Sequence, residues 1–143
     1  MLSKLKKYQN LDIRSLIDQS IRDNEKTILA LNRDQMWSDG TVDVNRPRVK
    51  EQYSDYTIPL KKKYARYKKT SFITLRWDGD FYESLYIDHQ PTQFTIKSDD
   101  PTWTFSLEPQ PRFENTLGLT RGSKAVLRDI VRTDILRRIR NAV

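Results

Sequence analysis

The chain has 143 residues, of which 36% are hydrophobic and 31% are charged, and its formal net charge is +7. This length fits one domain, spanning residues 1–143, with a single modest core. Seven tyrosines, five phenylalanines and three tryptophans argue against disorder. The absence of cysteine excludes disulfide bonds, thiolate metal sites and cysteine nucleophiles. The positive charge favours an acidic partner, namely nucleic acid, an anionic membrane or an acidic face of another protein, although solubility alone also explains it.

The sequence predicts no insertion into a membrane. Its apolar runs fall well short of the roughly 20 residues that cross a bilayer. The basic N-terminus leads into an amphipathic segment and not into the apolar stretch of a signal peptide. We therefore expect a protein that is made in the cytoplasm and has no membrane partner.

The first predicted element is one long helix from Leu11 to between Asn32 and Met36, because apolar residues recur there at helical spacing. Residues 38–52 are predicted to form an extended loop, since they contain the turn signal Asp39-Gly40 and the helix-disfavouring pair Arg46-Pro47.

A second, basic helix is predicted from Asp55 to about Lys69, with Ser54 in a position to cap it. Tyrosines alternate with basic residues in this stretch, a composition that suits phosphate contact and base stacking. A solvated helix face with its tyrosines in the core explains the pattern equally well. The basic residues are Lys61, Lys62, Lys63, Arg66, Lys68 and Lys69.

The middle of the chain predicts an antiparallel β-meander, because apolar and polar residues alternate in several short segments between turn formers. A short helical turn is expected at residues 81–84. The predicted strands are 72–77, 84–89, 93–97 and 103–107.

An irregular arm at residues 108–118 leads to a C-terminal helix, for which Thr120 or Ser123 is the expected cap. Seven aliphatic residues between Val126 and Ile139 predict a broad apolar face. The whole pattern predicts an α+β fold in which helices, including the C-terminal one, pack on the sheet. The arginines of the last helix are predicted either to face DNA or to pair with carboxylates of an adjacent subunit. They are Arg128, Arg132, Arg137, Arg138 and Arg140.

No catalytic, cofactor or metal site is predicted. His89 is the only histidine and is expected to be a surface or hydrogen-bonded residue. The acid pairs Asp78/Asp80 and Asp99/Asp100 suit a cation or acid–base chemistry, but turns recruit aspartate for capping, and that interpretation is favoured. No glycine forms part of a phosphate-binding loop. An enzyme with a dispersed acidic site is therefore the weakest hypothesis.

Several short blocks follow one another in a distinctive order. They are Trp37 after the first helix, Tyr53-Ser54-x-x-Thr57-x-x-x-Lys61, Leu75-x-x-Asp78-Gly79-x-Phe81-x-x-Ser84, Pro111-Arg112-Phe113 and Leu117-Gly118-Leu119-Thr120. In this order they resemble the tail-completion or neck proteins of tailed bacteriophages, head–tail connector proteins also called virion morphogenesis proteins. The chain departs from that family in a long gap between Trp37 and Tyr53 and in an aspartate, Asp78, where the family has threonine.

The resemblance implies a non-catalytic virion protein that forms a homo-oligomeric ring at the head–tail interface. Its implied partners are its own copies, portal or adaptor proteins and tail proteins, with genomic DNA passing through the ring lumen along the basic residues. Docking between subunits is expected from the loop and the arm, through Trp37, Arg46, Arg48, Arg112 and Phe113. The alternative is a nucleic-acid-binding accessory protein without sequence specificity.

Overall fold

A computed structural model describes residues 12–142, and it confirms the α+β fold. Beside the regular elements it contains a π-helical turn, Trp103–Leu107, and a 3-10 turn, Pro111–Phe113. The helices are α2 (Ile13–Asp23), α3 (Glu25–Trp37), α4 (Thr57–Tyr64), α5 (Asp80–Glu83) and α6 (Arg121–Ala142), and the strands are β1 (Leu85–His89) and β2 (Phe94–Ser98).

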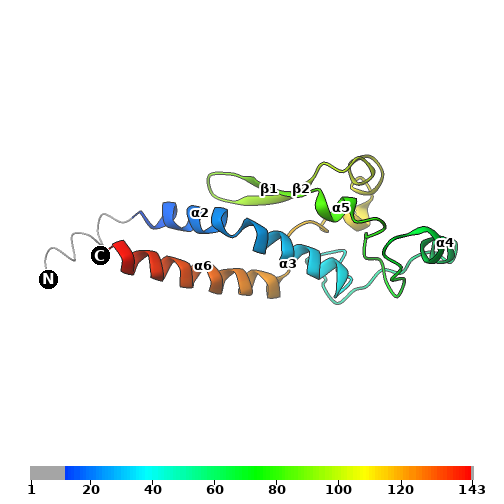
Figure 1. Ribbon diagram of the computed structural model, residues 1–143, viewed down its shortest axis with the longest axis horizontal. Coiled ribbons are helices and arrows are strands. Elements are labelled where there is room, and N and C mark those ends of the chain that lie inside the picture. The colour runs from blue at the N-terminus through cyan, green and yellow to red at the C-terminus, as the bar shows by residue number, and fades with distance from the viewer. Residues whose placement is uncertain (1–11, 143) are drawn as a thin grey trace, which may run out of the picture.

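The molecule is elongated, with α2 and α3 following one another along its long axis (Figure 1). The β-hairpin lies on one side of this pair and α6 on the other, while α4 occupies one end of the molecule (Figure 1). The predicted packing of α6 on the sheet is only partly right, because α6 makes its main contacts with α2 and further ones with α3.

The predicted single N-terminal helix is divided at Asn24, whose φ of −106° and ψ of 18° leave the helical region. The Asn24 side chain donates a hydrogen bond to the carbonyl of Ser20 at 2.7 Å and so competes with the regular helix ladder. Asp12 caps α2 by accepting a hydrogen bond from the amide of Ser15.

The second helix, α4, is shorter than predicted. The Ser54 hydroxyl accepts a hydrogen bond from the amide of Thr57 at 3.2 Å, but Ser54 is not the N-cap that was predicted. The helix begins at Thr57, so the N-cap is Tyr56, whose side chain makes no capping hydrogen bond. Ala65 is extended, and the ammonium of Lys68 folds back onto the carbonyl of Lys62 at the last turn. The basic segment is therefore half helix and half irregular chain.

Only two of the four predicted strands form, and they pair antiparallel with Tyr86 opposite Lys97. In segment 72–77, Leu75 adopts a φ of 59°, which breaks a strand. Segment 103–107 is helical because the Asp100 carboxylate accepts a hydrogen bond from the amide of Trp103 at 3.0 Å and starts a helical turn. The helical turn predicted at residues 81–84 is confirmed as α5.

The predicted arm at residues 108–118 packs into the molecule. Phe113 is only 2% exposed, and the centre of its ring lies 6.2 Å from that of Trp103. Trp103 in turn stacks on Phe81, with 4.7 Å between the ring centres. The Thr116 hydroxyl donates to the carbonyl of Val42 at 2.6 Å and so ties the arm to the loop at 38–52. Aromatic burial in the arm thus completes the core.

Two buried amide side chains of α3 fix the start of α6. Asn32 accepts a hydrogen bond from the amide of Gly118 at 3.0 Å. Gln35 accepts one from the amide of Thr120 at 2.9 Å and donates one to the carbonyl of Gly118 at 3.0 Å. Thr120 then caps α6, as predicted, through the amide of Ser123.

Candidate functional site

Three lysines of the basic segment donate hydrogen bonds to backbone carbonyls. The ammonium of Lys61 donates to the carbonyl of Lys69 at 2.7 Å, and that of Lys68 to the carbonyl of Lys62 at 2.8 Å. The ammonium of Lys69 donates to the carbonyl of Trp37, the last residue of α3, at 2.8 Å. Lys68 and Lys69 place positive charge at the C-terminal turns of α4 and α3, where it stabilises the carbonyls, so these two lysines serve the fold.

Lys61 is the most deeply placed of them, with 1% of its surface exposed. Its ammonium lies 5.2 Å from the centre of the Tyr53 ring, within range of a cation–π contact. Burial, with the charge of Lys69 as a second cause, lowers the pKa of Lys61 to about 8. The prediction that Lys61 faces DNA is therefore wrong for the described chain, because its side chain is enclosed.

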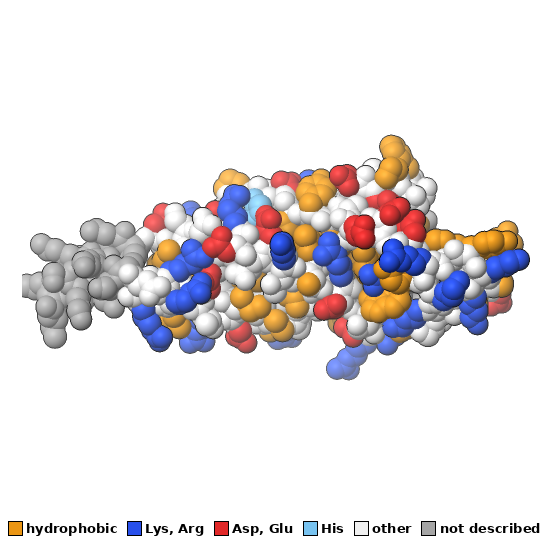
Figure 2. Space-filling model, in the orientation of Figure 1, with side chains coloured by type: hydrophobic (Ala, Val, Ile, Leu, Met, Phe, Trp, Pro, Cys, Tyr) orange, Lys and Arg blue, Asp and Glu red, His pale blue; other side chains and the backbone are white. Residues whose placement is uncertain are grey.

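The other basic residues of this segment form an exposed surface that we call the α4 tip: Lys62, Lys63 and Arg66, with Tyr56 and Tyr64 beside them. The two tyrosines are 79% and 65% exposed. Within residues 12–142, none of the three cations forms an ion pair with a carboxylate. Figure 2 shows basic and apolar side chains together at this end of the molecule. The tip thus presents free positive charge and aromatic rings to solvent.

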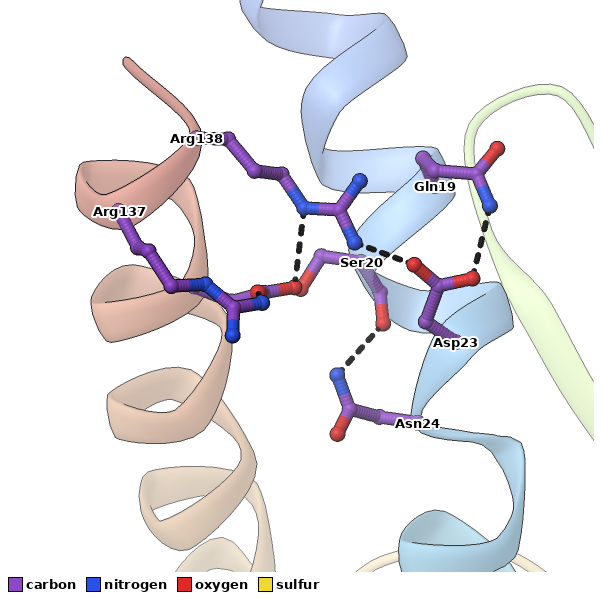
Figure 3. Close-up of polar contacts among 7 residues, drawn as sticks. Gln19, Ser20, Asp23, Asn24, Arg137 and Arg138 are labelled. Carbon is purple, nitrogen blue, oxygen red and sulfur yellow. Dashed lines mark hydrogen bonds and ion pairs between the residues drawn. The ribbon is translucent and has the colours of Figure 1, made fainter. Parts of the chain in front are cut away.

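The arginines of α6 likewise fall into two groups, those that form ion pairs within the protein and those that are exposed. Arg138 contacts both Asp134 on its own helix and Asp23 on α2, and Arg137 contacts Asp134 (Figure 3). We call this set the α2–α6 latch. The remaining predicted arginines, Arg128, Arg132 and Arg140, are exposed and make no ion pair in the described part of the chain.

The latch shifts the titration of its carboxylates. The neighbouring Ser20 hydroxyl and then the charges of Arg138 and Arg137 lower the pKa of Asp134. Hydrogen bonds from Arg138 and Gln19 lower the pKa of Asp23. Both aspartates therefore stay ionised at neutral pH, and the latch is a structural contact.

The two basic surfaces do not form one site. The α4 tip lies at one end of the long axis, whereas the C-terminal end of α6 lies at the opposite end, beside the start of α2 (Figure 1). One short stretch of nucleic acid could not contact both surfaces at once.

The predicted docking residues have different environments. Trp37 is half-buried, and the centre of its ring lies 5.8 Å from that of Tyr67 in an edge-to-face arrangement. Phe113 is a core residue, so the structure contradicts a docking role for it. Arg46, Arg48 and Arg112 are exposed.

Arg76 is a feature that the sequence did not indicate. Its guanidinium lies among aromatic rings, 3.9 Å from the centre of Tyr67, 4.8 Å from Tyr82 and 5.1 Å from Trp37. With Lys61 it lines a hollow of about 390 Å³, to which Asp80 also contributes. In the sequence, the only indication of its aromatic environment is that it stands between Leu75 and Trp77.

The candidate acidic sites serve turns. An Asp78 carboxylate oxygen accepts a hydrogen bond from the amide of Asp80 at 3.0 Å, and Asp100 caps the turn at Trp103. His89 contacts Glu25, in line with the predicted hydrogen-bonded role. Within residues 12–142, no three histidine, aspartate or glutamate side chains form a group that could hold a metal ion.

No protein-family model, curated protein or solved structure matches this chain. None of the described helices is both long and apolar enough to cross a membrane.

Proposed function

We propose that this protein is a structural component of a phage virion at the head–tail interface, where its copies assemble into a ring between portal and tail proteins. The observation that carries the assembly role is a set of nearly fully exposed aromatic side chains. Phe105 on the π-helical turn is 81% exposed, and Tyr56 on the α4 tip is almost equally so. Aromatic side chains are enriched at protein interfaces and dominate their binding energy.

The proposed position at the phage neck rests on the ordered sequence blocks that resemble those of neck proteins. The loop at residues 38–52 and the arm at 108–118 were expected to dock on a neighbouring subunit, and their exposed arginines support that expectation. Arg46, Arg48 and Arg112 remain exposed on these segments, where a neighbouring subunit can reach them.

The test is the position of the protein in particles made with and without its gene. We expect labelling of purified virions to place the protein at the neck, and deletion to leave filled heads and separate tails that a plasmid copy of the gene rejoins. Protein found only outside virions, with intact particles after deletion, would overturn the proposal.

A second candidate function is nucleic-acid binding without sequence specificity, favoured by the α4 tip. Its cations, which have no carboxylate partner among residues 12–142, and its exposed tyrosines suit phosphate contact and base stacking. We would change Lys62, Lys63 and Arg66 to alanine and leave the buried Lys61 intact. If the tip binds DNA, the slope of log affinity against log salt should fall by about 2–3.

The matched control for that experiment changes Arg121, Arg132 and Arg140 on α6, which removes the same charge elsewhere. An equal loss of DNA affinity in both variants would indicate that the protein attracts DNA by its net charge alone. No binding by the wild-type protein would exclude the second function.

A further inference from the structure

Charge is distributed unevenly between the segment that contains α5 and the hairpin and the helix α6. Residues 78–114, which include α5 and the hairpin, contain eight acidic and two basic residues. Residues 121–142, which form α6, contain seven basic and two acidic residues. These elements lie on opposite sides of α2 and α3 (Figure 1). A molecule with net charge +7 therefore has one acidic side.

The acidic side is exposed, and most of its carboxylates have no ion-pair partner among residues 12–142. Acidic side chains gather around α5 and the turn beside it (Figure 2). In the described chain only Asp88 of this group forms an ion pair with a lysine or arginine, namely Lys97. The charge and hydrogen bonding of Asp78, followed by the charges of Glu83 and Asp100, raise the pKa of Asp80. These carboxylates thus repel one another and would gain from a basic partner.

The basic side is the outer face of α6. With 3.6 residues per turn, Arg132 and Leu136 lie roughly opposite the buried Leu127 and Asp134. Arg128 lies about a quarter turn from Leu127, at the edge of this face nearest β2. Both arginines are exposed and unpaired within residues 12–142. This face therefore offers cations that no carboxylate of the described monomer neutralises.

Each side also carries apolar groups among its charges. Tyr86 and Phe105 are exposed on the acidic side, and Leu136 is exposed on α6. Protein interfaces combine an apolar centre with a polar rim, and complementary charge sets their orientation. Nucleic acid would match only the basic side, whereas a second copy of this chain matches both.

We propose that the acidic hairpin side of one molecule docks on the outer face of α6 of the next. The inference rests on the assembly role proposed above and names the surfaces through which it occurs. The two surfaces belong to elements on opposite sides of the molecule, so the contact is heterologous. Such a contact repeats from copy to copy and closes into a ring when the rotation between copies permits.

The test uses two double variants that reverse charge. Arg128→Glu with Arg132→Glu makes the α6 face acidic, and Glu83→Lys with Asp99→Lys makes the hairpin side basic. Asp78, Asp80 and Asp100 are left intact because they belong to the turns around α5 and the π-helical turn. Self-association is measured by sedimentation velocity at low ionic strength.

We expect the wild-type protein to self-associate, each variant alone to do so at least about tenfold more weakly, and an equimolar mixture to co-assemble. Co-assembly follows because the acidic α6 face of one variant matches the basic hairpin side of the other. The control, Arg14→Glu with Lys26→Glu, applies the same charge change to exposed positions of α2 and α3 and should associate like the wild type.

Wild-type association that survives both reversals, or that only the control variant abolishes, would overturn this choice of surfaces and leave the assembly role intact. A wild-type protein that stays monomeric in isolation would also overturn it. In that case the position of the protein in virions decides the assembly role separately.

Discussion

Lys61 carries a charge into the protein interior, where its ammonium has one carbonyl and one aromatic face as partners. The lowered pKa means that the unfolded chain, in which a lysine has a pKa near 10.5, binds more protons between pH 8 and pH 10.5. The free energy of unfolding therefore increases as the pH rises through that range, because the unfavourable contribution of Lys61 is progressively lost. Below pH 8 its unfavourable contribution is constant.

We predict that wild-type stability relative to Lys61→Met rises by about 3 kcal/mol between pH 8 and 10.5. Urea unfolding at several pH values measures this difference, with the exposed Lys62→Met as the control. A difference that does not change with pH would show that Lys61 keeps its ordinary pKa.

Gly40 permits a close approach that no other residue can make. It has a φ of +65°, and a Cβ added there would lie 2.4 Å from the Phe72 ring. We predict that Gly40→Ala lowers the free energy of unfolding by about 2–4 kcal/mol, through backbone strain and overpacking.

The control is Gly122→Ala in α6, where the nearest atom to the added Cβ lies 3.9 Å away. It should be neutral or stabilising by up to about 1 kcal/mol. Thermal unfolding of the two variants side by side measures the contrast, and equal stabilities would contradict it.

At the scale of elements, the α2–α6 latch holds together two helices that bury few apolar side chains against each other. Asp134→Asn leaves the half-buried Arg138 with a weaker partner, so we expect a loss of about 1–3 kcal/mol at pH 7. The pKa of Asp134 is lowered, so its contribution is complete above about pH 4 and disappears as the pH falls through the folded value.

Chemical unfolding at pH 7 and pH 3 measures the prediction for the latch. The control is Asp129→Asn, an exposed position on the same helix without an ion pair in the described chain. Equal effects at positions 134 and 129 would mean that the latch does not contribute to stability.

The sequence predicted elements whose own periodicity decides their conformation, such as α6 and the hairpin. It failed where a side chain redirects the backbone. The alternation of Trp103, Phe105 and Leu107 predicted a strand, but capping by Asp100 makes the segment helical and leaves Phe105 outside.

The basic residues were visible in the sequence, but their directions were not. Lys61, Lys68 and Lys69 reach carbonyls that only the folded chain brings within range. The division between structural and exposed cations is therefore a tertiary property, as is the aromatic surrounding of Arg76.

At the scale of the whole molecule, the thin core and exposed aromatic residues predict that assembly adds to stability. Binding to the folded state raises the free energy of unfolding by about 1.4 kcal/mol for each tenfold excess of concentration over the dissociation constant. The unfolding temperature should therefore rise with protein concentration. It should stay constant for the variant with Arg128→Glu and Arg132→Glu, and a constant wild-type value would contradict the prediction.

The amide side chains of Asn32 and Gln35 have a consequence for how the chain reaches this structure. They join positions more than 80 residues apart in sequence. Contacts of such long range form late, because the entropy of closing the loop must be overcome first. During synthesis α3 emerges long before its backbone partners, so its two amides remain hydrated until the chain is nearly complete. Docking of α6 should then be the last step of folding, and changes at Asn32 should mainly speed unfolding.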